Sequence, residues 1–365
     1  MAKKVGILTF HSAVNYGAVL QAAALNRKLT DLGIDNELIN YEDEEFRQVY
    51  GIQNKFDVTN KVVRLGLLVV KNIMFQMRKR KFISFLKSYT TLSSEKYTEA
   101  NIKASVNNYS KIITGSDQVW NMNLTGGDKS YFLDYVPEDK MMSYAASFGF
   151  SKLPDNLNRD EYASLLSRFD NPSIREDSGC DLYKELTGKA SLQHVDPTLL
   201  LTGDEWAKHF ELKNSNKRKY ILVYTVAVPV GLISHIEEIA REQDLDIIEI
   251  TPKFKTASKL IKAKHFCGPK DFLNLIYNAE MVATTSFHAT VFSMLFHKKV
   301  SVELLDKNNK RNVRIESLLK LVGHDYDGSS DIVDVFDVDY NKVDTNLESE
   351  RQRAFAYLKN AEERI

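Results

Sequence analysis

The first 41 residues constrain the fold more than any other stretch of the chain. Short runs that contain apolar residues, at Val5–Phe10 and Glu37–Tyr41, flank a mainly apolar segment at Ala18–Leu32. The two short runs indicate buried strands, and Gly33 lies where a glycine that ends a helix is expected. A strand, a helix and a second strand in this order form a βαβ unit, which requires a parallel sheet.

The same alternation returns further along the chain. The first half continues with expected strands at Lys111–Asp117, Tyr131–Val136 and Met141–Phe148, and with a helix at Arg159–Phe169. In the second half, the expected strands are Lys219–Val226, Leu245–Ile250, Met281–Thr285 and Lys299–Leu304. The helices expected between them are Val230–Gln243, Lys270–Ala279 and Ala289–His297.

Two Rossmann-like α/β domains that face each other across a cleft account for this pattern. We expect the first domain at residues 1–190, with a helical insertion at about 58–90, and the second at residues 191–340. Residues 341–365 are expected to form a C-terminal helix that packs back on the first domain.

Composition narrows the functional classes. Lys and Arg together number 49, as do Asp and Glu, so a formal charge of zero disfavours nucleic-acid binding. Cys180 and Cys267 lie far apart and form neither a metal-binding pattern nor a disulfide framework, which is typical of a reducing cytoplasm. The N-terminal apolar run is too short for a signal peptide. We therefore expect a cytoplasmic protein without a bound metal.

The most hydrophobic segment is Val62–Phe75, which Arg64 and Lys71 interrupt. A membrane span needs about 20 apolar residues, so this segment is not expected to cross a bilayer. A basic run, Arg78–Lys81, follows it. We favour a buried helix with a solvated basic turn; weak contact with an anionic membrane surface is the alternative.

Ligands of parallel α/β sheets bind beyond the carboxyl ends of the strands. Four polar corners follow expected strands: His11–Gly17, Gly115–Asn121, Arg175–Asp177 and Thr285–His288. None has the glycine fingerprint of a dinucleotide site or the lysine pattern of a P-loop. These corners are the candidate site.

Two corners offer acid–base chemistry. Asp117 supplies a carboxylate that can accept a proton from a sugar hydroxyl, and Trp120 supplies a flat apolar face beside it. His288 lies in the first turn of a helix, where the helix dipole disfavours the imidazolium ion. The structural alternatives are a helix cap for Asp117 and core positions for Trp120 and His288.

Two other features can bind anions or hydroxyls. Gly17 lets a backbone approach a ligand at a helix N-terminus, although Asn15 can also be a simple cap of that helix. Arg311 and Arg314 are three residues apart, so two guanidinium groups share one face of a helix start. They can hold a phosphate or a carboxylate; a solvated basic loop is the alternative.

Taken together, these motifs resemble the polysaccharide pyruvyl transferase family. The resemblance rests on TFHSAVNYGAVLQAAAL, GSDQVWN, SYAASFG, SIRED, HVDPTLLL, TTSFHAT and NVRIESLL, in this order between residues 5 and 323. The combination of GSDQVWN with NYGAVLQ is specific, whereas each motif alone is not. The stretch at 58–90 and the tail after about residue 330 carry little of it.

The resemblance implies a fold similar to the GT-B type of glycosyltransferases. It also implies phosphoenolpyruvate as donor substrate, with no further cofactor, and a pyruvate ketal formed across two hydroxyls of a sugar. The acceptor is expected in a cell-surface polysaccharide or its precursor, such as a lipid-linked oligosaccharide. A lipid-linked acceptor would lie at the membrane, so the protein can also be located at the inner face of the membrane.

The resemblance also implies roles for single residues. It assigns proton transfer to His288 and orientation or deprotonation of the acceptor hydroxyl to Asp117. The donor is expected to be held by Arg175, Arg311, Arg314 and Ser286. Contacts with the acceptor are expected from Asn15, Tyr16, Gly17, Ser116 and Trp120.

One position departs from the family pattern. Better-known members carry an arginine two residues before the motif histidine, where this chain has Ser286. Either Arg175, Arg311 or Arg314 supplies the missing charge, or donor binding differs. The competing hypotheses are a GT-B glycosyltransferase that uses a nucleotide sugar and a non-catalytic binding protein on the same fold.

Overall fold

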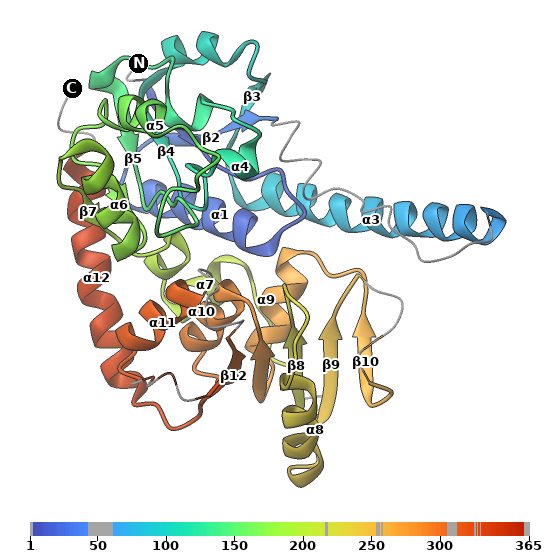
Figure 1. Cartoon of the computed structure of the whole chain (residues 1–365). Helices are drawn as coiled ribbons and strands as arrows, with labels where there is room; N and C mark the ends of the chain where they lie inside the picture. The colour runs from blue at the N-terminus through green and yellow to red at the C-terminus, as the bar shows by residue number, and fades with distance from the viewer. Residues whose placement is uncertain are drawn as a thin grey trace.

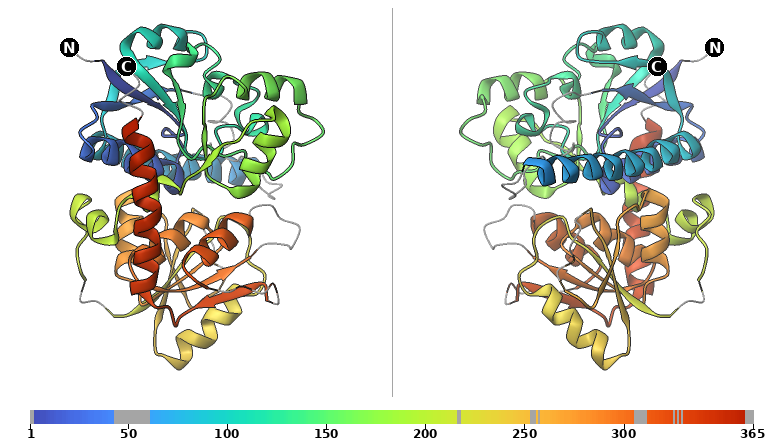
Figure 2. Two further views of the ribbon diagram at one scale, coloured as in Figure 1. Left: turned by 90° about the vertical axis from the view of Figure 1, so that its left-hand side faces the viewer. Right: turned by 90° about the vertical axis from the view of Figure 1, so that its right-hand side faces the viewer.

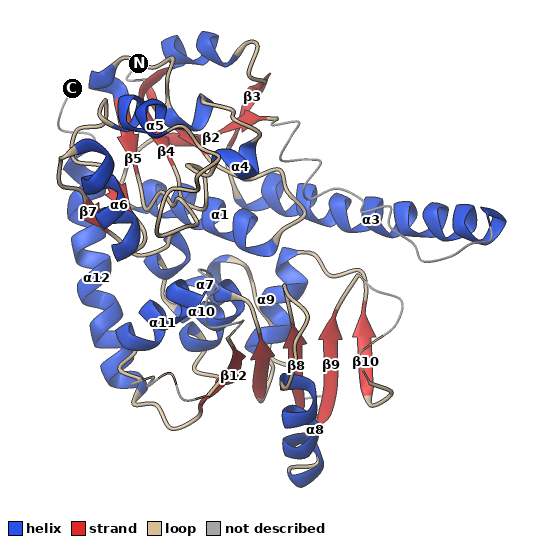
Figure 3. Cartoon of the chain, in the orientation of Figure 1, coloured by secondary structure: helices blue, strands red, loops and turns tan. Residues whose placement is uncertain are grey.

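The chain folds into two α/β domains, one above the other in Figure 1. The computed structural model describes residues 3–42, 61–215, 218–252, 256, 258–304, 312–324, 326, 328 and 330–360. Figure 3 shows both sheets, with helices packed around them.

The first domain is built on a five-stranded sheet in the order β3-β2-β1-β4-β5, with all neighbours parallel. Its strands are β1 (Lys4–Leu8), β2 (Asn36–Tyr41), β3 (Leu92–Tyr97), β4 (Tyr109–Thr114) and β5 (Met141–Ser143). Its helices are α1 (Tyr16–Asp31), α3 (Lys61–Tyr89), α4 (Met122–Thr125), α5 (Arg159–Leu166) and α6 (Asp177–Thr187). A separate parallel pair, β6 (Ser173–Ile174) and β7 (Leu192–Gln193), follows. The predicted boundary at residue 190 falls just before β7.

The second domain contains a six-stranded sheet in the order β10-β9-β8-β11-β12-β13, in which only β13 is antiparallel to its neighbour. Its strands are β8 (Tyr220–Tyr224), β9 (Asp246–Ile250), β10 (Ile261–Lys264), β11 (Met281–Thr284), β12 (Lys299–Glu303) and β13 (Ile332–Val335). The helices are α7 (Gly203–His209), α8 (Leu232–Glu242), α9 (Pro269–Tyr277), α10 (Phe287–Leu295), α11 (Asn312–Leu321) and α12 (Tyr340–Asn360). The short 3-10 helix η4 (Pro197–Leu200) leads into them.

One predicted strand is wrong. Residues 131–136 are not a strand: the 3-10 turn η2 (Ser130–Phe132) leads to Leu133, whose φ is 55°. The apolar side chains of this stretch are buried in the core of the first domain, so their hydrophobicity reflects burial and not a strand. Burial alone does not distinguish a strand from a buried turn.

The two domains share one hydrophobic core. A single cluster of buried side chains includes Leu20 of α1, Phe210 after α7, Phe272 of α9 and Phe292 of α10. Helix α12 runs along both domains, as Figure 2 shows. The Tyr357 hydroxyl near its end donates a hydrogen bond to a carbonyl of β5. The domains are therefore held against each other by packing as well as by the chain that connects them.

Helix α3 departs from the expectation of a buried helix. Phe82 and Phe85 in its second half are buried, but Val69 and Ile73 in its first half are 52% and 55% exposed. Figure 1 shows this first half projecting beyond the body of the molecule. Within the described ranges, helices long and apolar enough to cross a bilayer are absent.

Candidate active site

The site begins where two helix N-termini meet between the domains. Helix α1 is capped by Asn15, which accepts a hydrogen bond from the backbone N–H of Ala18. Helix α10 is capped in the same way by Ser286. A Cβ atom at Gly17 would lie 2.1 Å from Nδ1 of His288. Glycine is therefore required at this position because the imidazole of His288 fills the space that a side chain would occupy.

A buried carboxylate links this histidine to an arginine. Oδ2 of Asp196 lies 3.5 Å from Nε2 of His288 and accepts a 2.8 Å hydrogen bond from Arg175. Its other oxygen accepts from the backbone and the hydroxyl of Thr198. Burial opposes the charged form, but His288, Arg175 and Thr198 outweigh it and hold the pKa of Asp196 well below its usual range. Asp196 is therefore a fixed negative charge.

Arg175 lies at the centre of the charged groups. Its Nε donates a 2.8 Å hydrogen bond to Glu176, and its Nη1 donates to Asp196. Burial would lower the pKa of Arg175, but the charges of Glu176, Asp196 and Asp117 raise it above its ordinary value. The remaining nitrogen, Nη2, is buried and has no hydrogen-bond partner among the described residues. An unpartnered buried donor of this kind is suited to an anionic ligand.

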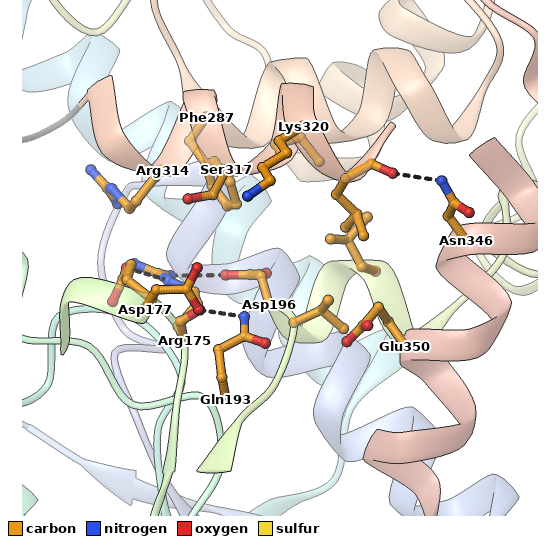
Figure 4. A pocket seen from close by; sticks show the side chains of 15 residues that line it. Arg175, Asp177, Gln193, Asp196, Phe287, Arg314, Ser317, Lys320, Asn346 and Glu350 are labelled. Atoms are coloured by element: carbon orange, nitrogen blue, oxygen red, sulfur yellow. Dashed lines mark hydrogen bonds and ion pairs between the residues drawn. The ribbon is translucent and has the colours of Figure 1, made fainter. Parts of the chain in front are cut away.

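A pocket of about 390 Å³ opens beside this network. Figure 4 shows Arg314, Ser317 and Lys320 of α11 on one side, with Arg175 and Asp196 on the other. The pocket is also lined by Glu176, Asp177, Gln193, Val195, Leu199, Phe287, Leu318, Leu321, Asn346 and Glu350. Its lining holds three cations and four carboxylates, of which Glu176 and Asp196 pair with Arg175. The three cations are the candidate contacts for a small anion.

Phe287 lies between two of these cations. The guanidinium carbons of Arg175 and Arg314 are 5.6 and 5.8 Å from the centre of its ring. Phe287 directly follows Ser286, the position at which the family pattern has an arginine. Arg314 thus brings a positive charge from α11 to the neighbourhood of that position.

The structure gathers part of the predicted site. Arg175 and Arg314 line the pocket, Ser286 caps the helix beside it, and His288 contacts Asp196. Asp117 is buried, and its charge acts on Arg175. Arg311, predicted as a further donor ligand, lies outside the described residues.

The predicted acceptor contacts are mostly occupied elsewhere. Tyr16 is 1% exposed, and its hydroxyl donates to the carbonyl of Cys267. Trp120 is fully buried, with its Nε1 directed at the carbonyl of Tyr131. Ser116 is also buried, and its hydroxyl donates to a backbone carbonyl. The polar groups of these three side chains are therefore satisfied inside the protein, and their contacts with an acceptor stay predictions.

Gly17 and Asn15 also have internal roles. Gly17 admits the imidazole of His288, where a ligand was expected, and the side chain of Asn15 caps α1. The N-terminal corner therefore positions the histidine and the helix, and it does not present a row of groups to the pocket.

Three site residues were given no role of their own from the sequence. Glu176 lies within the predicted corner Arg175–Asp177 and Asp196 within the motif HVDPTLLL, but neither was singled out. Asp196 follows β7, so the rule about the carboxyl ends of strands could have identified it. Lys320 lies in the last turn of α11 and has no local signal that separates it from a solvated lysine.

Comparisons with known proteins place the chain in a family. The family model for polysaccharide pyruvyl transferase matches residues 15–302. A search of curated proteins finds no match. In solved structures, S. aureus MnaA bound to UDP is similar, with 12% identity, a TM-score of 0.50 and coverage of 98% of this chain and 91% of that chain.

Two further similar structures are complexes of other proteins with UDP-sugars. The Methanocaldococcus jannaschii UDP-GlcNAc 2-epimerase has 13% identity, a TM-score of 0.49 and coverage of 96% of this chain and 93% of that one. Arabidopsis thaliana UGT89C1 in complex with UDP-L-rhamnose has 9% identity, a TM-score of 0.43 and coverage of 100% and 94%. At 12% identity the likeness to MnaA concerns the fold alone, which is of the GT-B type. Because the family model covers most of its length, the chain belongs to the polysaccharide pyruvyl transferase family, a family of transferases.

Proposed function

We propose that this transferase moves the enolpyruvyl group of phosphoenolpyruvate onto two hydroxyls of a sugar and forms a pyruvate ketal. The sugar belongs to a polysaccharide or to its precursor. The observation that carries the proposal is the buried chain of Arg175, Asp196 and His288 beside a pocket with further cations. It combines anion recognition with a group that can transfer protons.

The donor carries two anionic groups, a carboxylate and a phosphate. In the proposal, Arg314 and Lys320 of α11 bind these anionic groups from one wall of the pocket, and Nη2 of Arg175 binds them from the opposite wall. Glu176 and Asp196 hold the guanidinium of Arg175 in place, so little orientation is lost when the donor binds. Arg314 supplies the charge that the family pattern places at the position of Ser286.

The reaction balances without a metal or a redox partner. A proton is added to the methylene carbon of the donor and leaves an oxocarbenium-like centre. One sugar hydroxyl attacks this centre, the bond to the phosphate oxygen breaks, and the second hydroxyl closes the ketal. Of the two hydroxyl protons, one ends on the new methyl group and the other leaves with phosphate.

His288 is the proposed proton-transfer residue. Asp196 is placed to orient it, because its permanently charged carboxylate lies beside Nε2. His288 itself is 12% exposed and reaches the pocket wall through Asp196, which lines the pocket. Asp117 remains the proposed group that orients or deprotonates the acceptor hydroxyl.

The competing nucleotide-sugar hypothesis meets an obstacle at helix α8. The carboxylate of Glu303 accepts hydrogen bonds from the backbone N–H groups of Val230 and Gly231 at the start of this helix. A helix N-terminus is a natural site for a diphosphate, but here an internal carboxylate already fills it. A diphosphate at this terminus would have to displace Glu303.

Thermal unfolding with candidate donors tests the proposal. Phosphoenolpyruvate at about 100 times its dissociation constant should stabilise the folded state by about 2.7 kcal/mol and raise the melting temperature, whereas UDP and UDP-sugars should not. Phosphate release from phosphoenolpyruvate with a panel of sugar acceptors then tests transfer. Stabilisation by UDP-sugars alone would favour a glycosyltransferase. Binding of the donor without phosphate release with any acceptor would favour a non-catalytic protein.

A further inference from the structure

The projecting half of α3 carries apolar side chains at a helical spacing. Val69, Ile73 and Met77 are four residues apart and are 52%, 55% and 46% exposed. Side chains separated by four positions lie on the same face of a helix. This face is hereafter called the α3 outer face. An exposed row of apolar side chains is a feature of interaction surfaces.

The same helix is strongly basic. Its 29 residues include no Asp or Glu, although the whole chain has no formal net charge. Its basic residues are Lys61, Arg64, Lys71, Arg78, Lys79, Arg80, Lys81 and Lys87. A local excess of positive charge in a neutral protein points to an anionic partner.

Some of these cations are used within the protein. Lys81 forms a 2.7 Å ion pair with Asp271, and the guanidinium of Arg78 lies 6.0 Å from the centre of the Tyr16 ring. Arg80 and Lys87 are exposed instead. At 100° per residue, these two positions fall within the arc of Val69, Ile73 and Met77. The α3 outer face is therefore apolar toward the tip and cationic toward the body.

We propose that the α3 outer face docks the protein on an anionic lipid surface. The apolar side chains enter the boundary between headgroups and acyl chains, and Arg80 and Lys87 pair with the lipid phosphates. The second half of α3 anchors the helix to the body through buried Phe82, Phe85 and Leu86. An anionic lipid complements this face better than the same face of a second copy does, because α3 has basic residues and no Asp or Glu to pair with them.

Vesicle co-sedimentation of the full chain tests the proposal. The wild type is mixed with vesicles of phosphatidylcholine alone, or of equal parts phosphatidylcholine and phosphatidylglycerol, at low and high salt. We expect sedimentation with the anionic vesicles only, and its loss at high salt. Equal binding to both vesicle types, or no binding to either, would overturn the proposal.

Paired variants identify the surface. Replacing Arg80 and Lys87 with Gln should weaken binding about fivefold for each charge removed, whereas the same change at exposed Lys103 and Lys208 should leave it unchanged. Ile73→Gln with Met77→Gln should also weaken binding, in contrast to Val228→Gln with Leu260→Gln at other exposed sites. Equal losses in test and control pairs would contradict the proposal. So would a wild-type dimer that the Ile73 and Met77 replacements dissociate.

Discussion

The junction between the two domains has an aromatic side and a charged side. On the aromatic side, Tyr16 of α1 stacks on Phe272 of α9 at 4.5 Å, and its hydroxyl donates to the carbonyl of Cys267. On the charged side, Arg175 and His288 meet at Asp196. Tyr16 and Gly17 are adjacent in sequence, yet Tyr16 serves the aromatic side and Gly17 admits His288 on the charged side.

This difference assigns the two sides different roles: the aromatic side holds the domains together, and the charged side contains the groups proposed to bind and convert the donor. Aromatic rings that are fully buried stabilise the domain contact, and no polar group among them is left for a ligand. The charged side contains the pocket and Nη2 of Arg175, which has no hydrogen-bond partner among the described residues. We therefore expect substitutions on the aromatic side to change stability, and substitutions on the charged side to change turnover or donor affinity.

The largest effect is expected from His288→Ala. Loss of a proton-transfer group should lower turnover about 10²–10⁴-fold. The folded state should persist, because the imidazole lies at the margin of the site, beside Asp196, and is not part of the hydrophobic core. Steady-state phosphate release and a thermal melt measure the two quantities. His297→Ala, on an exposed histidine, is the control. Turnover at the wild-type level would remove His288 from the mechanism.

Tyr16→Ala should have the largest effect on stability. The loss of a fully buried ring should reduce the free energy of unfolding by about 3–5 kcal/mol. Tyr16→Phe removes only the hydrogen bond to Cys267 and should cost about 1 kcal/mol. Denaturant unfolding measures both. If Tyr16→Phe changed the KM for the donor while leaving stability intact, the two sides would not be separate.

A pH-dependent effect is expected from His194, which is buried on the charged side. Burial, and the charge of Arg353, lower the pKa of His194 to about 4. Because the unfolded state binds the proton near pH 6.5, this residue contributes stability above that pH. The contribution, about 3 kcal/mol, is lost as the pH falls from 6.5 toward 4. His194→Gln should flatten the dependence of the unfolding free energy in this window; an unchanged slope would exclude His194 as its source.

The last prediction tests the contact between the two helix N-termini. Gly17→Ala should destabilise the protein by about 1–3 kcal/mol, because the new Cβ overlaps the imidazole of His288. In a His288→Ala background the same change should be neutral or stabilising, since Ala favours helix formation. A double-mutant cycle by denaturant unfolding measures this coupling. Additive effects would mean that the two residues do not compete for space.

Much of the architecture could be predicted because hydrophobic periodicity reports burial. The expected strand and helix at the start of the chain match β1 and α1 to within two residues. Elements with weak apolar patterns were not predicted: β3, β10 and β13 are edge strands, and α6 begins with the polar run Asp177–Cys180. Their formation depends on tertiary contacts that no short window contains.

Site residues could be predicted where a reactive residue type directly follows a strand. His288 and Arg175 are conspicuous because each follows a buried strand. Trp120 carries a similar signal but points into the core, because side-chain direction at a turn is set by the fold and not by the residue type. The opposite error occurred in α3, whose apolar residues suggested burial but are partly exposed. Hydrophobicity alone does not say which partner covers a face.

Calorimetric titration of phosphoenolpyruvate into the wild type, Arg314→Gln and Tyr16→Phe tests the central claim most directly. Loss of one charge-assisted contact should weaken donor binding at least about tenfold in Arg314→Gln, with unchanged thermal stability. Tyr16→Phe should bind the donor like the wild type, because its ring lies on the aromatic side. Equal affinity in all three proteins, or binding of UDP-sugars with no binding of phosphoenolpyruvate, would contradict the account.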